Sequence, residues 1–174
     1  MFSAARTLFI SFFEICRFRL RPQDMPASRA LLLVTALAYL GVDAILAGID
    51  LPAADAVLTA SLETAGLAGY TAVVLGARGH HARIEQTLIA LLGSGLVLGL
   101  VAWPVVTWLH VARTTRVDVG APALLWLPVF VWSLLVSAHV YRHALSVRFG
   151  VGFLVTVVYV GLVLSVAGML GARA

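Results

Sequence analysis

Two carboxylates, Asp43 and Glu63, lie inside strongly apolar stretches of the sequence. Asp43 comes about ten residues before the centre of the turn between these stretches, and Glu63 about ten residues after it. At about 1.5 Å per residue in two antiparallel helices, this spacing predicts the same depth for both. Adjacent carboxyl groups can share one proton. We therefore expect either a proton or cation path or hydrogen-bonding between helices. Few other polar residues fall at this depth, which argues against a continuous polar pathway.

Four histidines form a second group of candidate residues. His80 and His81 are neighbours in a short turn, and His139 and His143 share one helix face at spacing i, i+4. Imidazoles in such numbers are a possible metal site, and histidines at a membrane interface without metal are the alternative. The HxxxH pattern lacks the glutamate of a metalloprotease motif. A haem would need histidines at matching depth, whereas His110 and His139 lie near opposite ends of their predicted helices.

The sequence has no combination of residues typical of an enzyme. We find no paired nucleophile and base, no glycine-rich phosphate loop and no CxxC motif. Cys16 is the only cysteine, which excludes an intramolecular disulfide, and we interpret it as a small apolar residue on a helix. The expectation is a non-enzymatic protein without a cofactor.

The composition is that of a membrane protein. Of 174 residues, 61% are hydrophobic and 11% charged, with a mean hydropathy of +1.02, whereas soluble domains are about one quarter charged. Crossing a bilayer takes about 20 apolar residues per helix. We predict an all-α fold, an integral membrane bundle of five transmembrane helices within residues 29–174, after an N-terminal unit at 1–28. The predicted spans are about 30–49, 56–77, 86–111, 121–141 and 149–171.

The distribution of arginine predicts the orientation of these spans. All twelve basic residues are arginine, and nine fall on the side of the N-terminus against three on the other side. Positive residues concentrate in cytoplasmic segments, so we expect a cytoplasmic N-terminus and an external C-terminus in a bacterial-type inner (plasma) membrane. This distribution also accounts for a pI of about 10.0 without nucleic-acid binding. The nine are Arg6, Arg17, Arg19, Arg21, Arg29, Arg78, Arg83, Arg142 and Arg148.

The first 21 residues are predicted to be neither a span nor a signal peptide, because charged residues interrupt a short apolar run and no cleavage site follows. With a period of 3.6 residues, most of the polar side chains share one face. This pattern predicts an amphipathic helix in the cytoplasmic interface, with its arginines near anionic headgroups. The predicted membrane-surface residues are Arg6, Arg17, Arg19 and Arg21.

Small residues recur at helical spacing in the predicted spans. Gly95 and Gly99 form a GxxxG pattern, and Gly161 and Gly168 are seven residues apart on the last span. Such residues allow helices to approach closely. We predict that they pack the bundle, with homodimerisation as the alternative.

The run Glu85-Gln86-Thr87-Leu88 opens the third span after a basic turn, and the segment 126–145 carries Trp132, His139 and His143 before a glycine-rich last span. In these features, and in a cytoplasmic segment followed by five spans, the chain resembles the Yip1-like family of small membrane proteins, in its uncharacterised bacterial branch. The eukaryotic members' Asp-Leu-Tyr-Gly-Pro motif is absent. The resemblance implies a non-enzymatic bundle that binds other membrane proteins or lipids.

Three functions remain in competition. The leading prediction is a scaffold or accessory subunit that associates with the lipid bilayer and with other membrane proteins or copies of itself. The alternative is a small transporter or proton-conducting component that uses Asp43 and Glu63. The third is a metal- or haem-binding membrane anchor that uses the histidines.

Overall fold

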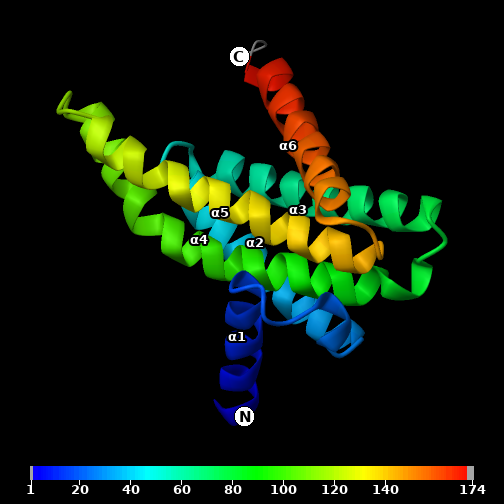
Figure 1. Ribbon diagram of the computed structural model, residues 1–174. Helices are drawn as coiled ribbons and strands as arrows, with labels where there is room; N and C mark the ends of the chain where they lie inside the picture. Colours follow the sequence, from blue (N-terminus) through cyan, green and yellow to red (C-terminus); the bar gives the residue numbers. More distant parts are fainter. Residues whose placement is uncertain (1, 172–174) are drawn as a thin grey trace.

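The computed structural model describes residues 2–171 and is helical throughout (Figure 1). Five of its helices, α2 to α6, are long and apolar enough to cross a membrane, as expected for a multi-pass membrane protein, and the described residues contain no strand. The order is α1 (Phe2–Cys16), η1 (Pro22–Asp24), α2 (Arg29–Ala47), α3 (Ala53–Ala77), η2 (His81–Arg83), α4 (Ile84–Thr114), α5 (Gly120–Ala144) and α6 (Phe149–Gly171).

Local sequence signals account for the helix ends. Ser28 caps α2, since its hydroxyl oxygen accepts a hydrogen bond from the Leu31 N–H at 3.4 Å. A residue in the left-handed conformation, such as Gly79 with φ +71°, follows four of the helices and lets a backbone N–H bond back to the last turn. The other three are Phe18, Arg116 and Ser146.

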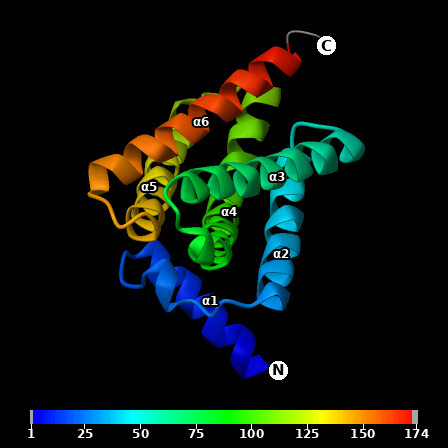
Figure 2. The ribbon, with the colours of Figure 1, turned by 90° about the vertical axis from the view of Figure 1, so that its right-hand side faces the viewer.

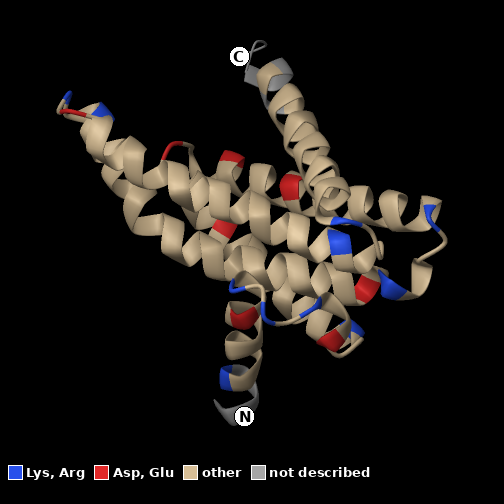
Figure 3. Ribbon diagram, viewed as in Figure 1, with Lys and Arg blue, Asp and Glu red and all other residues tan. Residues whose placement is uncertain are grey.

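The helices α2 to α5 alternate in direction, so that their connections gather at two ends. At one end, which we call the arginine-rich end, the α3–α4 turn meets the α5–α6 turn, because the Arg83 guanidinium donates to the Ala144 carbonyl at 3.0 Å and to the Ser146 hydroxyl at 2.7 Å. At the opposite end, His110 on α4 bonds Asp50 in the α2–α3 loop at 2.6 Å. Arginines mark both ends of the long helices and the turn after α1 (Figure 3). The arginine-rich end is defined by Arg29, Arg78, Arg83, Arg142 and Arg148.

The outer helices α1 and α6 project to opposite sides of the long helices, and the two termini lie far apart (Figures 1 and 2). Gly152 brings the start of α6 against α5, because a Cβ there would lie 2.5 Å from the Ala138 carbonyl oxygen. Val155 and Tyr159 still contact α3, and the end of α6 projects away from the long helices (Figure 1). The arrangement is therefore less parallel than a regular bundle of five helices.

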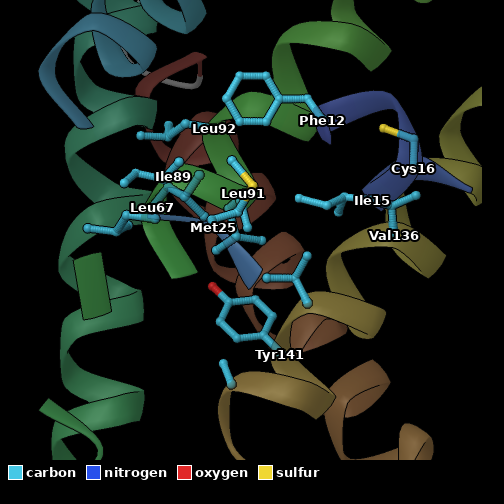
Figure 4. Close-up of a cluster of buried hydrophobic side chains, with 14 of the residues drawn as sticks. Phe12, Ile15, Cys16, Met25, Leu67, Ile89, Leu91, Leu92, Val136 and Tyr141 are labelled. Atoms are coloured by element: carbon cyan, nitrogen blue, oxygen red, sulfur yellow. The ribbon is translucent and has the colours of Figure 1, made fainter. Parts of the chain in front are cut away.

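The buried core lies in the half of the molecule toward the arginine-rich end, where α1, α3, α4 and α5 meet (Figure 4). Ile15, Leu75, Ile89 and Val136 come from these four helices, and each is fully buried. Long apolar side chains elsewhere are exposed, for example Leu37 at 69% and Leu124 at 72%. Such an exterior is unfavourable in water and suits contact with lipid.

The N-terminal helix differs from its prediction in two respects. It ends at Cys16 and not near residue 21, so that Arg17, Arg19 and Arg21 lie in the following turn. Its last turn also packs against α4 and α5. Phe12 stacks on Gly93, and the Trp132 indole N–H donates to the Cys16 carbonyl at 2.9 Å. This hydrogen bond joins the end of α1 to α5.

The two glycine pairs differ in what they contact within a single copy of the chain. A Cβ at Gly95 would lie 2.6 Å from the Tyr39 ring, and one at Gly99 would lie 2.9 Å from Val42, so α2 crosses α4 at the GxxxG pattern. Among the described residues, none lies within 4 Å of a Cβ at Gly161 or Gly168. The α6 pair therefore does not pack this bundle.

Candidate functional site

The carboxyl groups of Asp43 and Glu63 are hydrogen-bonding neighbours, although they belong to different helices, α2 and α3. Both side chains are partly buried. With both groups ionised, Asp43 Oδ2 is buried without a hydrogen-bond donor. If the pair holds a single proton, the O–H of one carboxyl group donates a hydrogen bond to the other. The missing hydrogen bond is then supplied within the pair. The depth argument from the loop spacing thus agrees with the observed contact.

Two tyrosines complete the surroundings of the pair. Tyr39 precedes Asp43 by one helical turn on α2, and Tyr159 comes from α6. Each lies near enough to both carboxyl groups to interact with them electrostatically. The Tyr159 hydroxyl also donates to the Glu63 main-chain carbonyl at 3.4 Å. Residues from α2, α3 and α6 therefore meet at one point.

Asp43 borders a cavity of about 290 Å³ enclosed mainly by α2, α4, α5 and α6. Tyr39 and Tyr159 line the same cavity. Glu63 is not part of the lining. Five further hydroxyl-bearing residues line the space, and the stacked rings of Trp126 and Phe130, with centroids 4.9 Å apart, form part of its wall. The five hydroxyl residues are Ser94, Ser133, Ser137, Tyr141 and Thr156.

These hydroxyls correct the expectation that few polar groups share the depth of the carboxylates. The correction arises from tertiary structure, because residues of five helices, α2 to α6, line the cavity together. One signal for this arrangement is local, since Tyr39 and Asp43 are four residues apart and share a helix face. No comparable signal links Asp43 to Tyr159, which is 116 residues away.

A second set of tyrosine contacts ties the helices together beside the cavity, of which Tyr141 is a lining residue. The Tyr141 hydroxyl lies 2.9 Å from the Thr71 hydroxyl, and both residues are fully buried. The Tyr70 hydroxyl donates to the Val155 carbonyl at 2.7 Å, which ties α3 to α6. Thr71 is a lone hydroxyl in the sequence, and the structure gives it a partner.

The four candidate metal-binding histidines are not assembled into a site. Within residues 2–171, no three His, Cys, Asp or Glu side chains gather as metal ligands would. His139 and His143 do stack edge to face, with centroids 4.6 Å apart. His139 Nε2 lies 3.1 Å from the Leu20 carbonyl oxygen, so this histidine is engaged with the turn after α1. His80 and His81 belong to the separate α3–α4 turn.

The predicted membrane-surface arginines divide into two groups. Arg6 is exposed on α1, and Arg17 forms an ion pair with Glu14 at 3.3 Å. Arg19 and Arg21 instead border a pocket near the end of α5. Nothing in the arrangement tests the interfacial position of α1 itself, which stays a prediction.

Cys16 is a structural residue, as interpreted from the sequence. Its side chain is fully buried, and its Sγ lies 3.7 Å from the Ser94 carbonyl oxygen. Burial raises the pKa of the Cys16 thiol to about 12. The reactive thiolate is therefore scarce while α1 is docked.

Comparisons of the chain with known protein families, with curated proteins and with solved structures find no match. The resemblance to Yip1-like proteins consequently stays a prediction, and the function has to be argued from the site.

Proposed function

We propose that this multi-pass membrane protein binds a proton, or a small cation in its place, at Asp43 and Glu63 as a component of a transport process. The observation that carries the proposal is the contact between the two carboxyl groups beside the cavity of about 290 Å³.

The carboxyl pair has no counter-ion among the described residues. No basic side chain lines the cavity, and across residues 2–171 no ion pair involves Asp43 or Glu63. Two ionised carboxylates in contact repel strongly where the dielectric constant is low. A positive charge therefore has to come from outside, either as a shared proton or as a cation that bridges the pair. Asp43 Oδ2, which has no donor, is a ready acceptor.

The cavity supplies space for a bound species. Its hydroxyl groups can replace part of a hydration shell. The faces of Tyr39, Trp126 and Tyr159 can attract a cation through their ring quadrupoles. A small organic cation with a proton-donating group therefore fits the lining as well as a proton does.

Proteoliposomes containing a pH-sensitive dye test the transport role. We expect the wild-type protein to carry proton flux, and Asp43→Asn or Glu63→Gln to abolish it. Asp55→Asn is the matched control, because Asp55 is exposed at the start of α3, about two helical turns before Glu63. Flux that is unchanged in both amide variants would overturn the proposal.

A second measurement tests the shared proton independently of transport. A hydrophobic carbodiimide reacts with protonated carboxyl groups in apolar surroundings, and mass spectrometry locates the modified residue. We expect modification at Asp43 or Glu63 and none at Asp55. A folded protein that is modified at neither residue of the pair would contradict the shared proton.

The scaffold or accessory role is the second candidate, and the uncovered part of α6 favours it. Gly161 and Gly168 lie in open space among the described residues, and the Ser165 hydroxyl is bonded to its own helix. Small residues of this kind allow another helix to approach. A single cysteine at Gly161 in a Cys16→Ser protein should then crosslink to another membrane protein or to a second copy. Crosslinking no stronger than at Gly41 on α2 would count against this role.

We also propose the inner (plasma) membrane as the location, with the arginine-rich end and the N-terminus in the cytoplasm. The excess of arginine at that end supports the orientation. In a Cys16→Ser background, an impermeant maleimide applied to intact cells should label Arg116→Cys and spare Arg78→Cys. Labelling of Arg78→Cys without labelling of Arg116→Cys would show that the proposed orientation is wrong.

A further inference from the structure

A basic pocket of about 480 Å³ lies near the arginine-rich end, between the turn after α1, the end of α5 and the start of α6. It is distinct from the carboxylate cavity, with which it shares no lining residue. The lining residues are Phe18, Arg19, Arg21, Leu135, His139, Arg142, His143 and Phe149.

The charges of this pocket are unbalanced. Three guanidinium groups line it, and no carboxylate does. Arg19 has only a loose ion pair, 3.8 Å from Glu14. Within the part of the chain that the structure describes, neither Arg21 nor Arg142 has a carboxylate within ion-pairing distance. An anion is thus the ligand class that the pocket attracts.

The nearest acid is already engaged. The Asp24 carboxylate accepts a hydrogen bond from the Arg21 main-chain N–H at 2.8 Å. It also interacts electrostatically with His143. It does not line the pocket. Guanidinium groups bind phosphate oxygens through pairs of parallel hydrogen bonds. Several arginines around one space therefore favour a phosphate group over a single carboxylate.

Apolar groups beside the basic ones indicate what carries the phosphate. Phe18 and Phe149 line the pocket with 43% and 37% of their surfaces exposed. The Phe149 ring stacks on that of Phe153, the next turn of α6, with centroids 6.5 Å apart, and Phe153 is also exposed. An apolar strip thus leads from the pocket along a helix that is apolar enough to cross a membrane.

The backbone helps to hold this arrangement. Phe18 adopts a φ of +62°, which is unfavourable for a bulky residue. The turn is held by the Arg19 N–H bond to the Glu14 carbonyl at 2.9 Å, and by the edge-to-face contact of Phe18 with His139 at 5.3 Å. This conformation places Phe18 and Arg19 on the same pocket.

We propose that the pocket binds the phosphate headgroup of an anionic phospholipid. Arg19, Arg21 and Arg142 hold the phosphate, and an acyl chain follows Phe149 and Phe153 along α6. Basic pockets between membrane helices are suited to such headgroups. The sequence predicts that Arg6, Arg17, Arg19 and Arg21 all bind the membrane surface. The proposed lipid site contains only Arg19 and Arg21 of these four.

Native mass spectrometry of the full-length protein in detergent tests the proposal, with phosphatidylglycerol as the probe. We expect retained phosphatidylglycerol, and weak retention of phosphatidylcholine, whose headgroup has no net charge. An arginine near an anionic lipid contributes about a fivefold gain in affinity, so the double variant Arg21→Gln with Arg142→Gln should lose about thirtyfold. The matched control is Arg113→Gln with Arg116→Gln, which removes the same charge at the opposite end and should leave binding unchanged.

Three outcomes would overturn the proposal. Equal retention of the two lipids would show that the headgroup is not recognised. An equal loss in the control variant would indicate a general effect of charge. Displacement of the lipid by inorganic phosphate alone would assign the pocket to a free anion. Because Arg142 is partly buried, Arg19→Gln in the exposed turn provides a second variant, expected to lose about fivefold. Unchanged binding in both variants would also refute the site.

Discussion

The packing of α1 against α4 and α5 gives the sharpest test of the fold. A Cβ added at Gly93 would overlap the ring of Phe12, which is 5% exposed. Three atoms of the ring lie in the place of the added methyl group, and the ring is buried, so relieving the overlap requires Phe12 and α1 to shift. Gly93→Ala should therefore loosen the docked helix while leaving the long helices assembled.

The magnitude follows from the cost of overpacking. An extra methyl group in a filled interior costs about 1–3 kcal/mol, and about 1.4 kcal/mol changes an equilibrium tenfold. The population with α1 undocked should then rise by about 5- to 150-fold. This range is well above the error of a kinetic assay.

Cys16 is a built-in reporter of this equilibrium. Because burial raises its pKa from 9.0 to about 12, the docked protein at neutral pH has about a thousandfold less thiolate than an exposed thiol would have. Maleimide labelling should therefore proceed through the undocked state, and its rate should rise with pH only to about 9. We expect Gly93→Ala to accelerate labelling by the factor given above.

Two controls make the test specific. Gly41→Ala on α2 adds the same methyl group where no described atom lies within 4 Å, and it should leave the labelling rate unchanged. Phe12→Ala should itself speed labelling, but adding Gly93→Ala to it should cost nothing more, because the overlap is gone. A Gly93→Ala protein that labels at the wild-type rate would refute the proposed packing of α1. If the effects of Phe12→Ala and Gly93→Ala on the labelling rate add fully in the double variant, the assigned contact between Phe12 and Gly93 is wrong.

Three further predictions concern single contacts. Gly152→Ala should lower thermal stability by about 1–3 kcal/mol, since its Cβ would meet the α5 backbone; a stability equal to wild type in a detergent melt would argue against the close crossing. Tyr141→Phe should cost about 0.5–1.5 kcal/mol by removing the partner of the buried Thr71 hydroxyl, and an additional Thr71→Val should cost little more if the two are paired. Trp132→Phe removes the hydrogen bond to the Cys16 carbonyl, so maleimide labelling should accelerate; an unchanged rate would show that this bond does not hold α1.

Part of the candidate site was accessible from the sequence. Asp43 and Glu63 were paired correctly because a short loop forces two helices to be antiparallel, which fixes the relative depth of their residues. The GxxxG pattern likewise predicted a close crossing at Gly95 and Gly99. The histidines were grouped by the same reasoning about depth, yet they do not form one cluster, because depth alone says nothing about position around the bundle.

The sequence by itself determined the class of the protein and the course of its chain. Apolar runs of membrane-spanning length specify helices locally, since every backbone group in lipid has to be satisfied within its own segment. Tertiary structure alone decided which side chains meet. Tyr159 lies near the carboxyl pair because of how α6 packs against α5. Arg142 and Arg21 line the same pocket because the turn after α1 packs against the end of α5. Such contacts depend on the rotation and crossing of whole helices, which the order of residues along one helix does not encode.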